Sequence, residues 1–247
     1  LGYLQMHGGV VAVVAQESFA YLANRTSGLQ VIDVSDPATP SLISEYFVDG
    51  FTGDVAVSAE STGFAYLISG DGLHVIDVSV PASPVRHGFY ERRFRDVAIS
   101  GQFRYLVVAP VGLNVIDISD PGNLRAVGSY TSSAEFESVS VSENIAYVTS
   151  GYGPVYAIDV TNPVDPRAVG EYHSNAHISS ASLWGKSRLI TNGYGEVQII
   201  DIGDPSNLRR LGGHTETGPG GVALSGHYAL VAAGVELDLV AGQGLLL

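Results

Sequence analysis

The stretch Val31-Ile-Asp-Val-Ser-Asp-Pro37 decides the fold, because the chain repeats it four more times with little change. The aspartates of the five copies are 44, 40, 42 and 42 residues apart. A nearly fixed period of this length indicates a repeat architecture, in which each unit buries its apolar face against its neighbour. The other copies are Val75-Ile-Asp-Val-Ser-Val-Pro81, Val115-Ile-Asp-Ile-Ser-Asp-Pro121, Ala157-Ile-Asp-Val-Thr-Asn-Pro163 and Ile199-Ile-Asp-Ile-Gly-Asp-Pro205.

Two more markers keep the same phase through the five units. One follows each Asp by 13 residues, and the other precedes it by 11 or 12. Each unit also has four short β-type runs, which in the second unit cover residues 55–58, 64–68, 73–78 and 84–90. Gly, Asp, Ser or Pro separates the runs, as turns require. Four such strands per unit are typical of a β-propeller blade. The later marker is Tyr46, Tyr90, Tyr130, Tyr172 and His214, and the earlier one is Tyr21, Tyr66, Tyr105, Tyr147 and Leu189.

The two ends of the chain indicate the number of blades. Leu1-Gly-Tyr-Leu-Gln5 matches a fourth strand such as Val127-Gly-Ser-Tyr130, and residues 221–240 match strands one to three. We therefore expect an all-β, six-bladed β-propeller with four antiparallel strands per blade, in which the N-terminal strand closes the last blade. The expected single domain spans residues 1–247, with blade units at about 8–51, 52–93, 94–135, 136–177, 178–218, and 219–247 closed by 1–7. We expect the last blade to be irregular, because Asp238 is one position out of register with Asp201.

The unit Gly-Leu-x-Val-Ile-Asp-Val-Ser-Asp-Pro, which follows a strand of the type Phe64-Ala-Tyr-Leu67, resembles the LVIVD-repeat propellers. The resemblance covers essentially the whole chain, and the Gly-His and Trp-Asp marks of WD40 units are missing. It implies a propeller of a kind found largely in exported or surface-associated bacterial and archaeal proteins, often as one module of a larger chain. It implies no shared enzymatic activity. On this basis we expect an extracellular, periplasmic or cell-surface location.

Composition excludes several classes of function. The 247 residues include no Cys, which excludes disulfides, thiolate metal sites and cysteine catalysis. The formal net charge of -13 argues against binding to nucleic acid, because displacing phosphate counterions needs a basic face. No apolar run is long enough to span a bilayer, so we expect no integral membrane protein. The chain shows no signal peptide and begins with Leu1 rather than Met, so we expect a processed or trimmed sequence.

Residues that recur in every unit are predicted to have a structural role that is common to all blades. The Ile-Asp aspartates are expected to accept backbone or hydroxyl hydrogen bonds at the end of strand three. The prolines that follow are expected to fix the turn to strand four. The repeated tyrosines are expected to pack between blades.

Function is expected where the blades differ, in the loops that precede strand one and in those that join strands two and three. Four residues before each first strand, the units read His7, Phe51, Arg93, Glu135, His177 and Gly218; two residues later they read Gly9, Gly53, Arg95, Glu137, Ser179 and Gly220. In a functional interpretation Arg93 binds an anion, Glu135 is a base or metal ligand, and His177 transfers a proton. In the structural alternative, Arg and Glu pair between neighbouring blades and fill the channel with water.

The loops between strands two and three add Arg25, Asp71, Tyr152, Tyr194 and Glu196. Tyr152 and Tyr194 lie between glycines at equivalent places in adjacent blades, where they can stack on a sugar or peptide or simply fill a turn. Glu91-Arg-Arg-Phe-Arg95 is the basic cluster of this acidic chain. An acidic ligand or partner docked there and a solvated loop both explain it.

Motifs for other chemistry are incomplete, so we expect no cofactor and no metal. His173 and His177 have the spacing used by metal-binding helices, but they span a strand end and a loop. Neither a nucleophile elbow nor an acidic calcium loop occurs. The chain therefore offers no complete catalytic motif.

Three hypotheses follow. In the first, the protein is a non-catalytic binding or scaffold propeller that presents a loop face to a protein or glycan partner, with Arg93, Arg95, Glu135, His177, His7, Phe51, Tyr152 and Tyr194 as the binding residues. In the second, it is an enzyme for a small anionic or saccharide substrate at the channel mouth, with His177 and Glu135 as the acid–base pair and Arg93 as the anion site. In the third, it is a structural subunit of a larger assembly.

Overall fold

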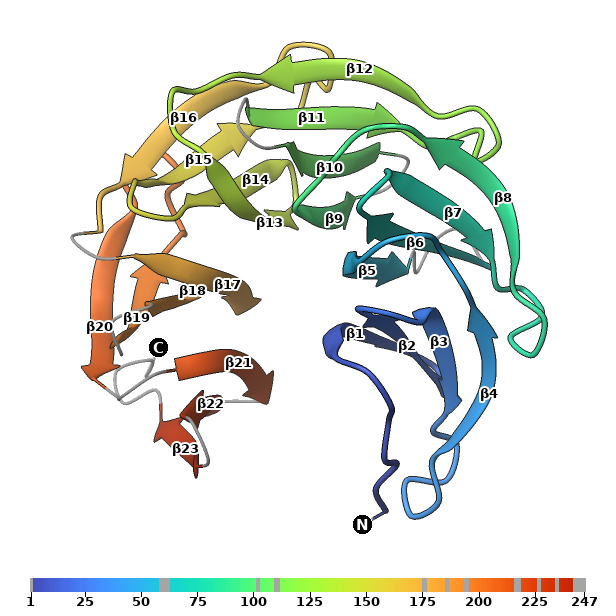
Figure 1. Ribbon diagram of the computed structural model, residues 1–247. Helices are drawn as coiled ribbons and strands as arrows, with labels where there is room; N and C mark the ends of the chain where they lie inside the picture. The colour runs from blue at the N-terminus through green and yellow to red at the C-terminus, as the bar shows by residue number, and fades with distance from the viewer. Residues whose placement is uncertain are drawn as a thin grey trace. The chain divides into compact units, whose positions relative to one another are not determined.

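The structure, a computed structural model, describes residues 2–57, 63–100, 103–108, 112–174, 177–184, 187–192, 196–215, 219–225, 228–233 and 236–241. Within these residues every regular element is a β-strand, and the strands form antiparallel sheets in chain order (Figure 1). Five sheets have four strands and the sixth has three in the described ranges. The all-β, four-stranded architecture expected from the repeat is therefore confirmed.

The first three sheets come from residues 10–130. They are β1 (Val10–Gln16), β2 (Phe19–Asn24), β3 (Gly28–Asp33) and β4 (Ser41–Tyr46); β5 (Thr52–Val57), β6 (Phe64–Ser69), β7 (Leu73–Asp77) and β8 (Val85–Tyr90); and β9 (Asp96–Ser100), β10 (Phe103–Val108), β11 (Gly112–Asp117) and β12 (Arg125–Tyr130).

The remaining sheets come from residues 136–241. They are β13 (Phe136–Ser142), β14 (Ile145–Ser150), β15 (Val155–Asp159) and β16 (Arg167–Tyr172); β17 (Ile178–Trp184), β18 (Ser187–Asn192), β19 (Glu196–Asp201) and β20 (Arg209–Thr215); and β21 (Pro219–Ser225), β22 (Tyr228–Ala233) and β23 (Glu236–Ala241).

The recurrent aspartates close the turn after the third strand of each complete sheet. Asp33 Oδ1 accepts a hydrogen bond from the backbone N–H of Ser35 at 2.8 Å. Asp77, Asp117, Asp159 and Asp201 accept the same hydrogen bond from the backbone N–H two residues later. Such Asx turns redirect the chain without a partner from another element. The structural role predicted for these aspartates is confirmed.

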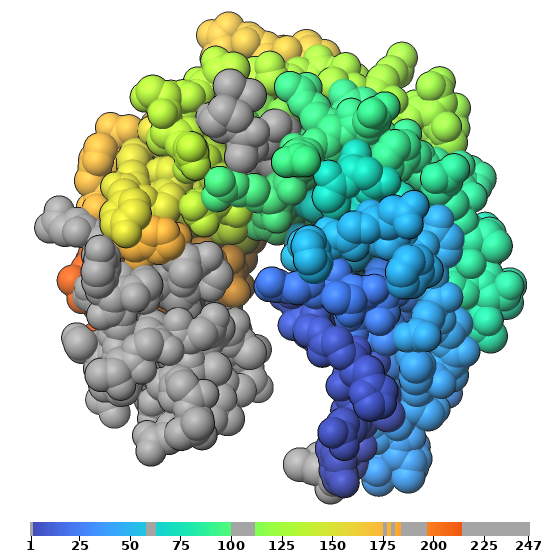
Figure 2. Space-filling view, in the orientation of Figure 1, coloured from blue at the N-terminus to red at the C-terminus, as the bar shows by residue number. Residues whose placement is uncertain are grey.

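The tyrosines of the second strands join neighbouring sheets. Tyr21 packs in a buried cluster with Ile76 and Val78 of the following sheet. Figure 2 shows the outer surfaces of these two consecutive segments, blue and teal, next to each other. Tyr66 packs with Ile116 and Ile118 in the same way. Tyr147 lies with Ile200, and its hydroxyl donates to the Ile202 carbonyl at 3.3 Å. Packing between blades, predicted for these residues, is confirmed for all three.

The fourth strand of a sheet touches the Asp-Pro turn of the next. A Cβ on Gly88 would lie 2.1 Å from Pro121 O, and one on Gly170 would lie 2.0 Å from Pro205 O. Both distances are too short for any side chain. In the first sheet Ser44 stands at this position, and its hydroxyl donates to the Pro81 carbonyl.

The N-terminal segment makes a related contact with the first sheet. The backbone N–H of Gly2 donates to Pro37 O at 3.0 Å, and a Cβ on Gly2 would lie 2.0 Å from Ala38 O. Residues 2–9 contain no strand, and the sheet of β21, β22 and β23 has no fourth strand in the described ranges. Closure of a six-bladed ring by residues 1–5 stays a prediction.

The contacts divide the chain into two compact units. Unit 1 contains Leu1–Ala109 and Asn114–Ser129, and unit 2 contains Pro110–Leu113 and Tyr130–Leu247. The described residues contain no helix long and apolar enough to cross a membrane.

Candidate functional site

The loops that the sequence singles out lie at one end of each sheet, because antiparallel strands place the connections 2–3 and 4–1 together. A β-bulge begins the first strand of five sheets: register shifts occur at Val10/Ala12, Thr52/Asp54, Phe136/Ser138, Ile178/Ser180 and Pro219/Gly221. Bulges change the direction of a strand and the aim of its side chains. We call residues 49–53, 70–72 and 91–95 of unit 1 the unit-1 loop face.

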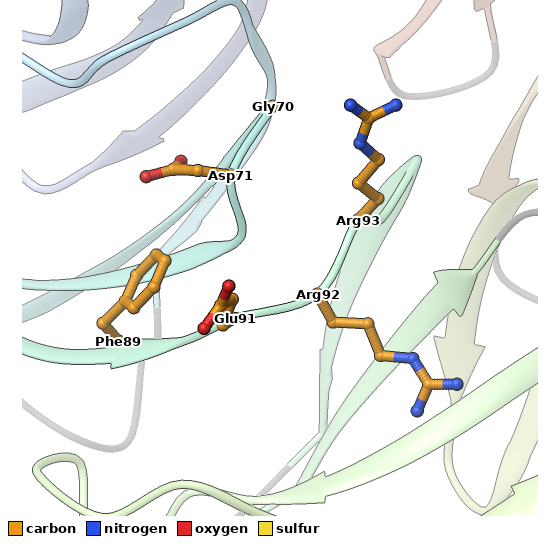
Figure 3. A pocket seen from close by; sticks show the side chains of 6 residues that line it. All are labelled: Gly70, Asp71, Phe89, Glu91, Arg92 and Arg93. Atoms are coloured by element: carbon orange, nitrogen blue, oxygen red, sulfur yellow. The ribbon is translucent and has the colours of Figure 1, made fainter.

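The unit-1 loop face is hollowed by two adjoining pockets. One has a volume of about 540 Å³, and Phe51, Asp71, Arg93 and Phe94 are among its lining residues. The other, of about 530 Å³, is lined by Gly70, Asp71, Phe89, Glu91, Arg92 and Arg93 (Figure 3). Gly70, Asp71 and Arg93 belong to both. Volumes of this size accommodate a side-chain cluster of a partner or a small ligand.

Two predicted residues, Phe51 and Arg93, line this hollow. The Phe51 side chain is 69% exposed, which leaves a large aromatic surface in water. Arg92 and Arg93 are exposed and form no ion pair or hydrogen bond within the described residues. Arg95 is also exposed, but it has an interaction of its own. An apolar ring beside guanidinium groups is the composition of a protein-binding surface.

Asp71 is the one carboxylate of the hollow that the fold holds in place. Its Oδ1 accepts hydrogen bonds from the Ser69 hydroxyl and from His74 Nε2, the latter at 3.0 Å. Burial opposes ionisation, but the hydrogen bonds from Ser69 and His74 outweigh it and lower the pKa of Asp71. The side chain is nevertheless 46% exposed. A charged, oriented carboxylate therefore faces the solvent-filled pockets.

His74 is a residue whose role the sequence did not reveal. It occupies the variable position of the Gly-Leu-x-Val-Ile-Asp motif and is only 4% exposed. The same register holds Gln30, Asn114 and Gln198, which are also buried and polar. A buried polar side chain needs a partner, and His74 finds it in the loop carboxylate of Asp71. The recurrence of polar residues at this position is the signal that was available.

His7 does not occupy the place that the sequence alignment gave it. Val13 pairs with Leu22 as Val55 pairs with Leu67, so Gly9, and not His7, is equivalent to Phe51. The bulge between Val10 and Ala12 lies at the same repeat position as the bulge at Thr52/Asp54, so the two first strands are otherwise in the same register. His7 is exposed, and its carbonyl accepts a hydrogen bond from Asn24 Nδ2 at 2.7 Å.

In unit 2 the structure brings His177 and Tyr152 together. Their ring centroids are 4.8 Å apart at 71°, an edge-on contact, and the Tyr152 side chain is 76% exposed. The backbone N–H of Ile178 donates to Gly151 O at 2.8 Å and fixes the two loops to each other. A Cβ on Gly151 would lie 3.0 Å from His177 Nε2 and 3.2 Å from Glu137 Oε1. Glycine at this position thus leaves room for both side chains.

The enzyme hypothesis names Glu135 and His177 as the acid–base pair and Arg93 as the anion site. Glu137 Oε1 and His177 Nε2 both lie beside Gly151, and Glu135 is exposed. Arg93 belongs to unit 1 and the other two residues to unit 2. Tyr194 lies outside the described residues.

A carboxyl pair on two first strands was also missed. The Asp54 and Asp96 side chains are hydrogen-bonded, and the N–H of Val97 lies 3.1 Å from Asp54 Oδ2 and 2.8 Å from Asp96 Oδ1. Burial, followed by the hydrogen bond and repulsion from Asp96, raises the pKa of Asp54 well above its ordinary value. The available signal was that Asp54 and Asp96 stand at the same position of two consecutive repeats. Ala12 and Ser138 occupy this position in the first and fourth repeats.

Four segments of the chain match the family model described as the LVIVD repeat: residues 7–48, 49–92, 91–132 and 135–174. The fold is similar to that of the computationally designed Ika8 protein, with a TM-score of 0.71 and 12% identity over 96% of this chain and 72% of the other. A protein from Lactobacillus plantarum gives a TM-score of 0.81 and 11% identity over 94% of this chain and 83% of its own. These likenesses show the fold alone, which is β-propeller-like. No curated protein sequence matches the chain significantly.

Proposed function

The chain belongs to the LVIVD-repeat family, and from this premise we propose that it is a non-catalytic binding module whose unit-1 loop face docks a protein partner. One observation carries the proposal: Phe51 and Arg93 border the same hollow, Phe51 exposed and Arg93 without a partner among the described residues. Burial of an aromatic ring together with pairing of an arginine is the usual source of affinity at protein interfaces. The rigid sheets behind the loops keep both in position.

A glycan partner is a second candidate, because one observation in unit 2 favours it. Tyr152 presents most of its ring to solvent, and His177 supports it from the side. An exposed aromatic ring with a fixed orientation can stack on the apolar face of a sugar. In this case the binding surface is the loop pair of Tyr152 and His177.

The location and the closure of the ring belong to the same proposal. We place the protein outside the cytoplasm on the basis of the family resemblance. Gly2 contacts the Pro37–Ala38 turn as Gly88 contacts Pro121, which supports residues 1–5 as the missing fourth strand beside β23. A closed ring leaves no open sheet edge.

The test is quantitative capture of partners from the organism's own extract on immobilised protein. Phe51→Ala and Arg93→Ala are compared with Val164→Ala, whose exposed side chain lies in a turn after β15. The proposal expects a protein that the wild type and the Val164→Ala control capture equally and that both loop variants lose. Loss in Tyr152→Ala alone, with release of the captured species by free sugars, indicates the glycan partner. Equal capture by every variant contradicts both.

A further inference from the structure

The charges of the pocket in Figure 3 are separated. The carboxylates of Asp71 and Glu91 lie on the side of the Phe89 ring, and the side chains of Arg92 and Arg93 extend away from them in different directions. No ion pair of Glu91, Arg92 or Arg93 occurs within the described residues. The two acids are therefore not neutralised by the arginines beside them.

Ser69 and His74 orient Asp71 without cancelling its charge. The Ser69 hydroxyl is a neutral donor, and the buried His74 reaches Asp71 through Nε2. His74 Nδ1 is buried and has no hydrogen-bond partner among the described residues. A proton on Nδ1 would leave a buried N–H unsatisfied, so the neutral tautomer with hydrogen on Nε2 fits the site best. Asp71 thus keeps a full negative charge at the pocket wall.

The second oxygen of Asp71 is available to a ligand. Both side-chain hydrogen bonds go to Oδ1, and no side chain of the described residues donates to Oδ2. The Asp71 backbone N–H also supports the carboxylate. A carboxylate fixed through one oxygen binds a cation with little further loss of side-chain entropy.

Phe89 completes the wall and accepts cations on its ring. The guanidinium carbon of Arg86, which does not line the pocket, lies 5.9 Å from the Phe89 centroid. The His74 ring packs against Phe89 with centroids 4.9 Å apart and holds the ring in place. Two carboxylates beside an aromatic ring form the usual setting for a guanidinium or ammonium group.

We infer that the pocket of Asp71, Glu91 and Phe89 binds an arginine or lysine side chain of the partner protein. The inference rests on the proposed function and names the chemical anchor of that partner. The same partner contacts Arg93 with a carboxylate, because Asp71 and Arg93 line the same two pockets. In this arrangement Ser69 and His74 are positioning residues, which act through Asp71.

The test uses a peptide of known charge in place of the partner. The blocked pentapeptide Gly-Gly-Arg-Gly-Gly is titrated into the isotope-labelled full chain, and binding is followed by the NMR amide shifts of residues 70–72 and 89–93. The same peptide with citrulline, which has the shape of arginine and no charge, is the control probe. We expect saturable shifts with the arginine peptide, none with the citrulline peptide, and weaker binding as salt is added.

The variants separate recognition from positioning. Asp71→Asn should weaken the arginine peptide about tenfold, and Glu91→Gln a few-fold, because each removes one charge-assisted contact. His74→Gln should retain the affinity for the arginine peptide, since Gln stands at the equivalent position of β3. His74→Leu should weaken this affinity in the wild-type background. In a chain that already carries Asp71→Asn, His74→Leu should not weaken it to the same extent. The thermal midpoint of each variant shows whether it folds. Equal shifts with the citrulline peptide, or full affinity in Asp71→Asn, overturn the inference.

This experiment fails independently of the proposed function. If the arginine peptide does not bind while Phe51→Ala still loses the partner, the cation pocket is wrong and the docking face stands. If the peptide binds at Asp71 while Phe51→Ala and Arg93→Ala capture the partner as well as the wild type does, the cation pocket is supported and the docking face is wrong.

Discussion

The carboxyl groups of Asp54 and Asp96 are hydrogen-bonded to each other across two neighbouring sheets, β5 with β9. Two carboxylates cannot share such a contact when both are charged, so one proton is held between them. The Val97 N–H, which is within reach of both acids, fixes the pair at the sheet boundary. The folded protein therefore holds a proton that the unfolded chain releases at about pH 4, the ordinary pKa of aspartate.

This proton makes the stability of the protein depend on pH. Because the folded-state pKa of Asp54 is raised, its contribution to stability is complete below the ordinary aspartate pKa of about 4 and is lost as the pH rises toward the raised pKa. Asp54→Asn keeps the hydrogen bond without the proton. We expect it to raise the thermal midpoint at pH 7 by about 2–4 °C and to change it little at pH 4, as measured by circular dichroism.

Asp49→Asn is the matched control, since Asp49 is exposed and lies in the same region. It should leave the difference between pH 4 and pH 7 unchanged. A midpoint for Asp54→Asn that falls equally at both pH values would show that Asp54 is charged in the folded protein.

The contact between fourth strands and Asp-Pro turns predicts a position-specific effect of alanine. Gly170→Ala places a Cβ 2.0 Å from Pro205 O and should destabilise the fold by about 1–3 kcal/mol, because β16 must move away from the next sheet. Gly212 occupies the equivalent register in β20, and no described atom lies within 4 Å of its Cβ position. Gly212→Ala should be neutral or slightly stabilising in urea unfolding. Equal effects of the two changes would argue against this packing.

The Asx turns predict that one recurrent aspartate matters more than the others. Asp117 accepts hydrogen bonds from the N–H and hydroxyl of Ser119 and from Arg125; the bonds from Ser119, then Arg125, lower its pKa to about 2. The contribution of Asp117 to the free energy of unfolding is present above about pH 4, the ordinary aspartate pKa, and is lost as the pH falls toward the lowered pKa of about 2. Asp117→Ala should cost about 1–3 kcal/mol at pH 7.

Asp33→Ala is the comparison, because Asp33 closes the same turn without an arginine. In a chemical unfolding experiment, Asp33→Ala should lower the free energy of unfolding by less than Asp117→Ala does. A larger loss for Asp33→Ala would show that the Arg125 contact adds nothing.

The edge-on contact of unit 2 predicts a local effect without a global one. Tyr152→Ala removes an exposed ring, so the free energy of unfolding should change by less than about 1 kcal/mol. The NMR signals of the His177 ring should nevertheless shift, because they lose the ring current of a neighbour 4.8 Å away. Tyr3→Ala, which also removes an exposed ring, should leave the His177 signals in place. Unchanged His177 signals in Tyr152→Ala would contradict the contact.

The strands and turns could be predicted from the sequence because each of them recurs in five copies of the repeat. Every copy of the Ile-Asp motif needs an Asx turn, and each second-strand tyrosine at 21, 66 and 147 needs the neighbouring sheet. Register is specified less well where the pattern is continuous. β1 reads Val-Val-Ala-Val-Val, and these residue types do not mark which valine corresponds to Val55, so the sequence alignment placed His7 two positions away from its true equivalent.

The site was only partly predictable, because it depends on contacts between loops and buried positions. Phe51 and Arg93 were found as departures from the repeat, and both line the hollow. His74 stands at the variable position of the repeat motif, and the residue types do not show that its ring reaches Asp71. Glu137 Oε1 and His177 Nε2 both lie beside Gly151, which is a relationship between loops that the residue types alone do not indicate.

Hydrogen exchange measured with and without the captured partner tests the central claim most directly. The Asp-Pro turns and the unit-1 loop face lie at opposite ends of the antiparallel strands, so the footprint distinguishes them. If the unit-1 loop face docks the partner, protection is confined to residues 49–53, 70–72 and 91–95 and disappears in Arg93→Ala. Protection at the Asp-Pro turns near residues 36–40, 80–84 and 120–124 instead would contradict the account.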